Sequence, residues 1–495
     1  MGGAVAVWPS GPIPASGGLE VASARGRWVL AAAVLGSGIA GIDSAVMNVA
    51  LPVIGRDLRA DFSQLQWTVT GYTLSLAALI LLSGALGDHF GRRRVFLIGV
   101  IGFTGASVLC ALAPGIDALI GDRSIQGIGG ALMIPASLAI IQSSFRAEDR
   151  SRAIGIWSGF SGVASVTAPF AGGGLLDLGT WRWIFVINVP VAAVLVLIAV
   201  RHVPESQEAA PAPMDWLGSL FAVVALATVT YVLTTMPGQR SASPLTIAAA
   251  VMAAGISAAF VWHERRSEAP MLPVAVFRSA PFVAANLVTF FVYGALGAFS
   301  FVFTVALETI SGYSPIEAGS TLLPITIIAL LLSGRSGQLA ARIGPRLQMT
   351  AGPFLCAVAA LLAVRVSAHT GYWTTVIPLE CVFGLGIAAL VAPLMSTALS
   401  SVPTDHAGVA SGVNNAVSRA AALLWIAALP PLAGLSGSSY ATAAALRGGY
   451  QEICIVCAAS LALAGTLAAF TLRRRQRHPL ADIVPPRLPH PAACH

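Results

Sequence analysis

The chain contains no lysine and few charged residues of any kind. All 28 of its basic residues are arginine, and Asp, Glu, Lys and Arg together account for only 10% of the 495 residues. Hydrophobic residues account for 56%, and the mean hydropathy is +0.81. A single soluble core cannot bury that much apolar surface, so the composition predicts a protein that crosses a bilayer many times. The absence of lysine also excludes a Walker phosphate loop, which requires one.

Cysteines are few and scattered. Of the six, only Cys454 and Cys457 have a C-x-x-C spacing, and both fall in an apolar run. In such a run they are better explained as small packing residues than as a redox or metal pair. The net charge of +7 comes from arginines grouped in loops and not from a continuous basic face. We therefore expect no nucleic-acid partner, no metal and no cofactor.

Fourteen apolar runs are long enough for membrane-spanning helices, which need about 20 residues each. The first six are 28–51, 65–84, 94–113, 116–141, 152–176 and 183–200, the next two are 216–235 and 244–262, and the last six are 282–308, 316–338, 347–366, 373–397, 406–433 and 449–471. The runs thus form a pattern of six, two and six.

Arginines are concentrated in alternate segments between the spans. They crowd the segments at 92–94 and 146–152 and the tail from Arg473 onward, which lie on one side if the spans alternate. By the positive-inside rule this side is the cytoplasm, and both termini lie there. The predicted domains are a flexible N-terminal tail (1–27), a six-helix bundle (28–200), a connector with two inserted helices (201–280), a second six-helix bundle (281–472) and a C-terminal tail (473–495).

One polar loop occurs twice. Residues Gly84–Arg93 read G-A-L-G-D-H-F-G-R-R, and Gly337–Arg346 read G-Q-L-A-A-R-I-G-P-R, with the glycines, the leucine and the last arginine at the same spacing. Each copy follows the second span of a six-span group, which indicates two parallel structural repeats. The second copy has Ala341 where the first has Asp88.

The first copy of the loop resembles the cytoplasmic signature of the major facilitator superfamily, and the fourteen spans resemble its drug:proton antiporter branch. Similar stretches of that branch are I-D-S-A-V-M-N-V-A-L-P (Ile42–Pro52), R-S-I-Q-G-I-G-G (Arg123–Gly130), G-V-A-S-V-T-A-P-F-A-G-G-G (Gly162–Gly174) and W-R-W-I-F-V-I-N-V-P from Trp181. The resemblance covers residues 28–472 and implies an all-α fold of two six-helix bundles plus two inserted helices. Ala168 departs from the usual glycine before Pro169.

The loop is expected to act as a conformational switch. Gly84 and Gly87 would let the helix end approach a neighbour closely, and Gly91 would permit a tight turn. Asp88 is expected to pair with an arginine or a helix N-terminus near 146–152. The alternative is an ordinary positively charged inner loop. The proposed switch residues are Gly84, Asp88, Gly91, Arg92 and Arg93.

Charged residues within spans are costly and are therefore candidates for function. At 1.5 Å per residue, Asp43 lies roughly 22 Å above the inner surface and Arg123 roughly 12 Å below the outer one, so they reach similar depths. A carboxylate whose proton affinity depends on burial and on a nearby guanidinium suits a proton carrier. The alternative is a static ion pair. Glu308 joins them as a proton-coupling candidate, or else it is a solvated helix end.

The fifth span carries a run of small residues. Gly162, Pro169, Gly172 and Gly173 would permit tight packing against the other half, and we expect this contact to seal the cytoplasmic side when the cavity faces outward. For Arg419, binding to substrate and binding to a backbone carbonyl both stay open. The candidates for the substrate cavity are Asn48, Gln126, Trp157, Tyr293, Asn414 and Arg419.

The function implied by the resemblance is a proton-coupled antiporter that exports amphipathic, drug-like or antibiotic compounds by alternating access. The alternatives are proton-coupled uptake and dedicated export of a self-made metabolite. No converging Ser/His, His/Glu or paired-aspartate set lies within the spans, so an enzyme is not expected. We expect a monomer in the plasma membrane of a bacterium, whose partners are protons, an amphipathic small molecule and the lipid bilayer.

Overall fold

The computed structural model describes residues 18–177, 179–207, 215–235, 243–267, 270, 274–402, 407–435 and 442–471. Over these ranges nearly every residue is helical, and no β-strand forms. The all-α fold class predicted from the composition is therefore confirmed.

Every predicted span coincides with one helix or with two consecutive ones. The first group is α1 (Ala24–Asp57), α2 (Phe62–Phe90), α3 (Arg92–Leu112), α4 (Ile116–Ser144), α5 (Ala147–Asp177), α6 (Trp183–Val186) and α7 (Asn188–His202). Then come α8 (Trp216–Thr235), α9 (Pro244–Arg266) and the short 3₁₀ helix η1 (Val274–Arg278). The last group is α10 (Ala280–Ile310), α11 (Pro315–Ser320), α12 (Leu323–Ile343), α13 (Arg346–Ala363), η2 (Tyr372–Val376), α14 (Ile377–Ser400), α15 (Ala407–Leu432) and α16 (Ala443–Thr471).

Most of these helices are long and apolar enough to cross a membrane. Within the described ranges, twelve helices are long and apolar enough to be candidate membrane spans. This number counts α6 with α7, α11 with α12, and η2 with α14 as single spans. Helix α2 is bent by 53° between Phe62–Ile80 and Leu82–Phe90, and it makes a thirteenth if it is one span. Helix α5, which is 31 residues long, occupies the place of the remaining predicted span.

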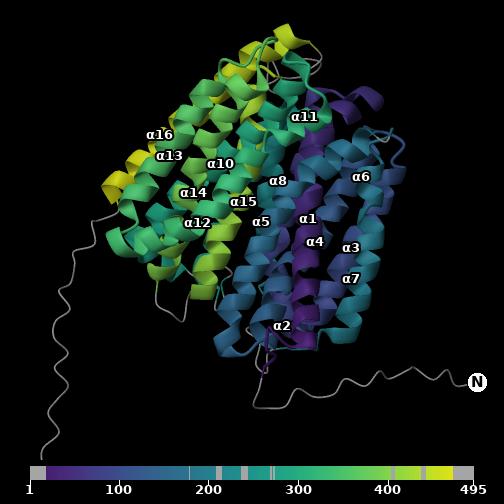
Figure 1. Ribbon diagram of the computed structural model, residues 1–495, viewed down its shortest axis with the longest axis vertical. Helices are drawn as coiled ribbons and strands as arrows, with labels where there is room; N and C mark the ends of the chain where they lie inside the picture. The colour runs from purple at the N-terminus through teal and green to yellow at the C-terminus, as the bar shows by residue number, and fades with distance from the viewer. Residues whose placement is uncertain are drawn as a thin grey trace, which may run out of the picture.

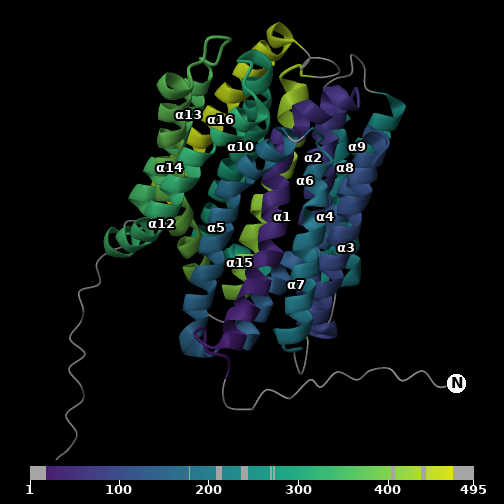
Figure 2. The same cartoon turned by 45° about the vertical axis from the view of Figure 1, so that its right-hand side comes forward.

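The helices pack in two groups joined by the inserted pair. In the first group α4 packs along α2 and α3, and α1 packs against α5 and α7. In the second, α10 packs against α15 and α16, and α14 packs against α12 and α13. Helices α8 and α9 pack on each other, and α8 also contacts α2 and α15. Figures 1 and 2 show α12, α13, α14 and α16 on one side and α1, α3, α4 and α7 on the other, with α5 and α15 between them. The domain boundaries stay predictions.

Helix α1 begins earlier than the sequence suggested. The expected tail was 1–27, but the helix starts at Ala24 because the Ser23 hydroxyl caps it by accepting a hydrogen bond from the Gly26 amide at 3.0 Å. The expected tail had included these residues because the first 25 are rich in glycine, proline and serine. Residues 1–17 and 472–495 lie outside the described residues.

Among the described residues, the hydrophobic core that both groups share lies towards one side of the molecule. We call the side where α1 begins and α16 ends the terminal side, and the opposite side the distal side. Towards the distal side Leu51 and Ile54 of α1 share one hydrophobic core with Leu307 of α10, and Gln66 of α2 donates hydrogen bonds to carbonyls of α15. Towards the terminal side the cores are separate, with Val29 in one and Phe282 in another. The distal side is therefore the closed one.

We expect Gly129→Ala to destabilise the protein strongly. A methyl group at Gly129 of α4 would lie 2.5 Å from the backbone nitrogen of Phe103 on α3, so the two helices would have to separate. Overpacking of this kind costs about 1–3 kcal/mol. Thermal unfolding of the purified protein should show a clear fall in Tm. The matched control is Gly102→Ala, whose methyl group would meet nothing within 4 Å and should leave Tm unchanged or slightly raised. Equal effects of the two substitutions would contradict the packing account.

Candidate functional site

The structure brings together the two charged residues that were expected to share a depth. Asp43 of α1 and Arg123 of α4 form a direct ion pair through Oδ2 and Nη1. Both side chains are almost fully buried, being 2% and 1% exposed. Charges removed from water to this extent need close partners, and each residue is the other's partner.

Neutral amides complete the surroundings of Asp43. Gln126 of α4 donates from Nε2 to Asp43 Oδ1 at 2.9 Å and to Ser107 Oγ of α3 at 2.8 Å. Asn188, the first residue of α7, donates from Nδ2 to the same two atoms at 3.3 and 3.1 Å. Gln126 also accepts a hydrogen bond from Arg123. Asp43 thus receives donors from Arg123, Gln126 and Asn188, a set that matches an ionised carboxylate.

Arg123 lies between aromatic rings. Its guanidinium carbon is 4.3 Å from the centre of the Tyr72 ring on α2 and 5.8 Å from that of Phe185 on α6. Such cation–π contacts favour the charged guanidinium, which does not lose its proton in proteins. Arg123 therefore stays a cation beside the carboxylate of Asp43.

Sequence reasoning missed two members of this group and placed a third elsewhere. Ser107 and Asn188 are uncharged, and only Asn188 stood in a noted stretch, the W-R-W-I-F-V-I-N-V-P segment. Gln126 was assigned to the substrate cavity, but it is fully buried and its amide bonds to Asp43 and Ser107. In this conformation it belongs to the ion-pair group.

The other cavity candidates do not form one cluster. Asn48 is half-buried on α1, and Trp157 of α5 packs against the core of the first group. Asn414 of α15 is buried and donates to Asn286 Oδ1 at 3.2 Å and Thr289 Oγ1 at 2.8 Å, both on α10. This geometry favours a bridge between two helices of the second group.

Arg419 and Tyr293 do lie near each other. The charge of Arg419 on α15 is close enough to act on Tyr293 of α10 and on Tyr72 of α2. Over the described part of the chain, Arg419 forms no hydrogen bond and no ion pair. Tyr72 is also the ring that lies against Arg123.

The repeated loop adopts the same turn twice. Gly91 has a φ of 100° and its counterpart Gly344 a φ of 88°, a region that favours glycine. The tight turn expected at Gly91 is therefore confirmed. The close approach expected at Gly84 and Gly87 is absent, because added methyl groups there would have no neighbour nearer than 3.8 Å.

The partner expected for Asp88 was wrong. Asp88 bonds to Arg92 across the turn, with Oδ1 accepting from Nη2 at 2.7 Å and from Nε at 3.0 Å. Arg146, the first candidate, instead pairs with Glu20 at 2.8 Å and Asp149 at 3.3 Å. Four residues separate Asp88 from Arg92, and the glycine turn returns the chain so that they meet.

A residue outside the loop holds it in place. Glu205, just after α7, accepts a hydrogen bond from the Arg93 amide at 3.0 Å and lies 3.7 Å from the Nε atoms of both Arg93 and Arg94. A methyl group at Gly91 would lie 2.6 Å from Glu205 Oε1, so glycine also makes room for this contact. The connector to the inserted pair is therefore clamped to the switch loop.

The glycines of α5 pack on the side opposite to the one expected. A methyl group at Gly173 would lie 2.6 Å from Ile316 Cα on α11, and one at Gly172 would lie 2.7 Å from Val46 of α1. These contacts are at the distal end of α5 and help to close the distal side. The expected seal was on the cytoplasmic side, which is the terminal side if both termini are cytoplasmic. The discrepancy follows from helix direction, because α5 starts on the terminal side and the glycines come late in it. The surroundings of Gly162 and Pro169 lie outside the described residues.

Two carboxyl groups of the second helix group have no hydrogen-bond partner among the described residues. Glu308 lies in the last turn of α10 with both oxygens buried, and the charge of Arg56 on α1 is near enough to act on it. Glu380 of α14 is 0% exposed, and both of its oxygens are likewise unpartnered. Sequence analysis missed Glu380, although it lies seven residues inside the predicted span 373–397 and is a charged residue within a span.

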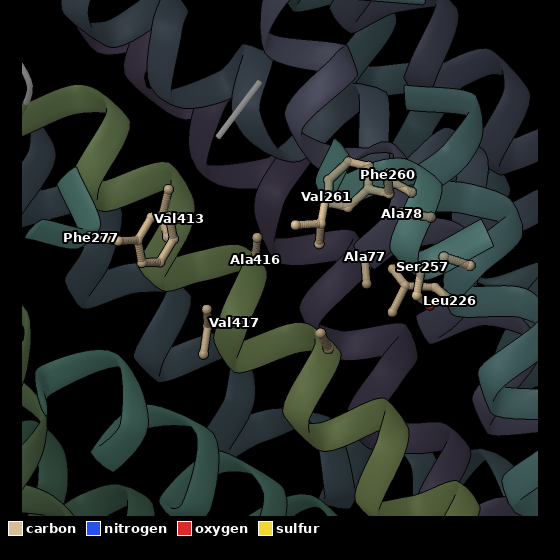
Figure 3. Close-up of a pocket in the computed structure, with 13 residues that line it drawn as sticks. Ala77, Ala78, Leu226, Ser257, Phe260, Val261, Phe277, Val413, Ala416 and Val417 are labelled. Atoms are coloured by element: carbon tan, nitrogen blue, oxygen red, sulfur yellow. The ribbon is translucent and has the colours of Figure 1, made fainter. Parts of the chain in front are cut away.

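An apolar pocket of about 330 Å³ lies where the inserted pair meets both groups of helices. Figure 3 shows Val413, Ala416 and Val417 along α15, with side chains of α2, α8 and α9 around them. Its walls are almost wholly aliphatic and aromatic. This pocket was not predicted.

Comparison with known proteins decides the family. The model described as Major Facilitator Superfamily matches residues 33–426. The chain belongs to the major facilitator superfamily. It is 35% identical over 377 residues to the multidrug resistance protein Stp of Mycobacterium tuberculosis, covering 76% of this chain and 70% of that protein. Membership indicates a membrane transporter of small molecules and not an enzyme.

Further relatives agree. The tetracenomycin C resistance and export protein of Streptomyces glaucescens is 33% identical over 412 residues, which cover 82% of this chain and 76% of that one. Among solved structures, an inward-facing bacterial homologue of the human lysosomal transporter Spinster superposes with a TM-score of 0.64 at 18% identity, covering 91% of this chain and 97% of its own. That similarity supports the shared fold.

Breaking the buried ion pair on one side should cost more than removing both charges. Arg123→Gln leaves the Asp43 carboxylate without its cation, which for buried pairs costs about 3–5 kcal/mol. Adding Asp43→Asn removes the orphaned charge and should restore part of the loss. Thermal unfolding of the two single variants and the double variant gives the coupling. Additive losses would show that the pair is not energetically coupled.

Proposed function

We propose that the chain is a proton-coupled antiporter that exports amphipathic, drug-like or antibiotic compounds by alternating access. The observation that carries the proposal is the buried Asp43 carboxylate, which is held by donors from α4 and α7 within a transporter of the major facilitator superfamily. The names of the relatives, a multidrug resistance protein and a resistance and export protein, support export.

Proton binding to Asp43 would be linked to helix position. Three donors favour its ionised form in the present arrangement, so a proton binds well only when α1 moves away from Arg123, Gln126 and Asn188. Conversely, loss of the proton favours the return of those contacts. The protonation state of one carboxylate can thus shift the equilibrium between two arrangements of the helices.

The loop and the α5 contact would govern which side is open. Distal closure through Gly172 and Gly173 leaves the terminal side as the accessible one, where compounds from the cytoplasm would enter if both termini are cytoplasmic. That orientation rests on the arginine distribution. The Asp88–Arg92 pair and the Glu205 clamp hold the loop in this state. We also propose a monomer in a bacterial plasma membrane.

A dedicated exporter of a self-made metabolite is the second candidate. The relative named as a tetracenomycin C resistance and export protein favours this candidate. Both candidates share one mechanism and differ in the breadth of compounds carried.

Proton coupling is tested in everted membrane vesicles. A proton gradient should drive accumulation of fluorescent amphipathic dyes, and an uncoupler should abolish it. Accumulation that survives the uncoupler would refute antiport. Asp43→Asn should remove gradient-driven accumulation while dye binding to the purified protein persists, because an amide cannot carry the proton. The control is Asp122→Asn, next to Arg123 but only half-buried, which should transport normally. Normal pumping by Asp43→Asn would make Asp43 structural.

The loop clamp is tested by Glu205→Gln and Asp88→Ala. Each removes a charge that holds the turn, so transport in the same vesicles should fall several-fold while the amount of protein in the membrane stays unchanged. Glu148→Gln serves as the control, because Glu148 is an exposed carboxylate in the first turn of α5. If transport by the Glu205 variant matches that of the Glu148 variant, the clamp has no role in the cycle.

A further inference from the structure

Helix α15 presents three different faces. Val413, Ala416 and Val417 face the apolar pocket shared with α2, α8 and α9 (Figure 3). Asn414 faces α10, to which it donates two hydrogen bonds. Ala422 also faces α10, since its Cβ lies 3.0 Å from where a methyl group of Gly297 would be.

Arg419 lies on the third face. At 100° per residue it lies between the other two, about 60° from Ala416 on the pocket side and about 60° from Ala422 on the α10 side. Asn415, about 40° from Arg419 on this scale, is exposed. Charged and strongly polar side chains on a membrane helix face the interior of the bundle or a water-filled cavity and not lipid. Arg419 therefore points between the two groups of helices.

Two tyrosines are consistent with the direction given by the helix geometry. The charge of Arg419 is close enough to influence Tyr293 of α10 and Tyr72 of α2, one from each group. Tyr72 in turn lies against Arg123 of the ion pair. One aromatic ring thus separates Arg419 from the residues proposed to carry the proton.

No acidic side chain among the described residues balances Arg419. Asp43 is engaged by Arg123, and Asp88 of α2 is engaged by Arg92. The remaining carboxylates on helices packed against α15 are Glu308 of α10, Glu380 of α14 and Glu452 of α16. Glu308 and Glu380 lack any hydrogen-bond partner, and Glu452 is exposed and forms no ion pair with Arg419. A half-buried guanidinium without an anion is an incomplete site.

We infer that Arg419 binds an anionic group of the transported compound, such as a carboxylate or a phenolate, with the half-buried Tyr293 beside the apolar body of that compound. This inference rests on the proposed function and names its substrate class. A guanidinium binds oxyanions through charge-assisted hydrogen bonds, and the neighbouring Tyr293 supplies an apolar face. The transported compounds are then amphipathic anions, or contain an anionic group.

The experiment measures equilibrium binding to the purified full chain in lipid nanodiscs, with no gradient. The probes are fluorescein and rhodamine 123, which share a xanthene ring system but carry opposite charges at pH 7.5. We expect fluorescein to bind at least about tenfold more tightly, the size of effect that one charged hydrogen bond supplies. A wild-type preference for rhodamine 123 would overturn the inference.

Variants locate the preference. Arg419→Gln should weaken fluorescein binding by about tenfold and change rhodamine 123 binding by less than about twofold, whereas Arg419→Lys should keep the preference for fluorescein. Arg365→Gln, which removes an exposed arginine of the distal side, should change neither. Equal weakening of both dyes by Arg419→Gln, or no weakening of either, would refute a charge contact. If Arg419→Gln does not fold, Arg419→Met replaces it and the wild-type preference still decides.

The result is separable from the test of antiport. Vesicles that fail to respond to a proton gradient would refute the proposed function even if purified protein selects fluorescein through Arg419. Gradient-driven export of cationic dyes only, with no effect of Arg419→Gln, would instead refute the anionic substrate and leave antiport intact.

Discussion

A carboxylate buried among membrane helices has to be surrounded by hydrogen-bond donors, and this requirement organises the first group of helices around Asp43. The donors come from α4 and α7, and Ser107 of α3 bonds to both amides. Close packing delivers them. A methyl group at Gly127 would lie 2.3 Å from the Tyr72 carbonyl, so this glycine brings α2 against α4 and lays the Tyr72 ring on Arg123. The R-S-I-Q-G-I-G-G stretch therefore supplies both the charge and the packing that the charge needs.

Much of this arrangement could be predicted from the sequence, because its signals are long and local. Apolar runs gave the helices, and depth along two of them brought Asp43 and Arg123 together. The predictions that were wrong, and the residues that were missed, depended on the direction of a side chain around its helix or on contacts between distant segments. Asn188 and Ser107 carry no charge that hydropathy can register. Glu205 acts from a connector that looked like a linker, and the partner of Asp88 lay four residues away, across a glycine turn.

Charge is distributed unequally between the two groups. In the first, the deeply buried charges are paired, and Glu205 meets the arginines of its loop. In the second, Arg419, Glu308 and Glu380 have no ion partner among the described residues, and they lie on three different helices. Pairing fixes the first group as a defined unit around one buried carboxylate. The unpaired groups of the second are free to respond to what arrives from outside the chain, whether a ligand, water or a proton.

The inserted pair also bears on how such a molecule moves. Helix α8 contacts α2 in one group and α15 in the other, so any rocking of the groups has to be absorbed along its surface. The pocket there is lined by alanine, valine and other apolar side chains, with almost no polar atoms. Apolar contacts have no directional bonds to break, so the two surfaces can slide past each other by small steps. The pair thus covers the joint between the two groups with apolar contacts that do not fix the angle between them.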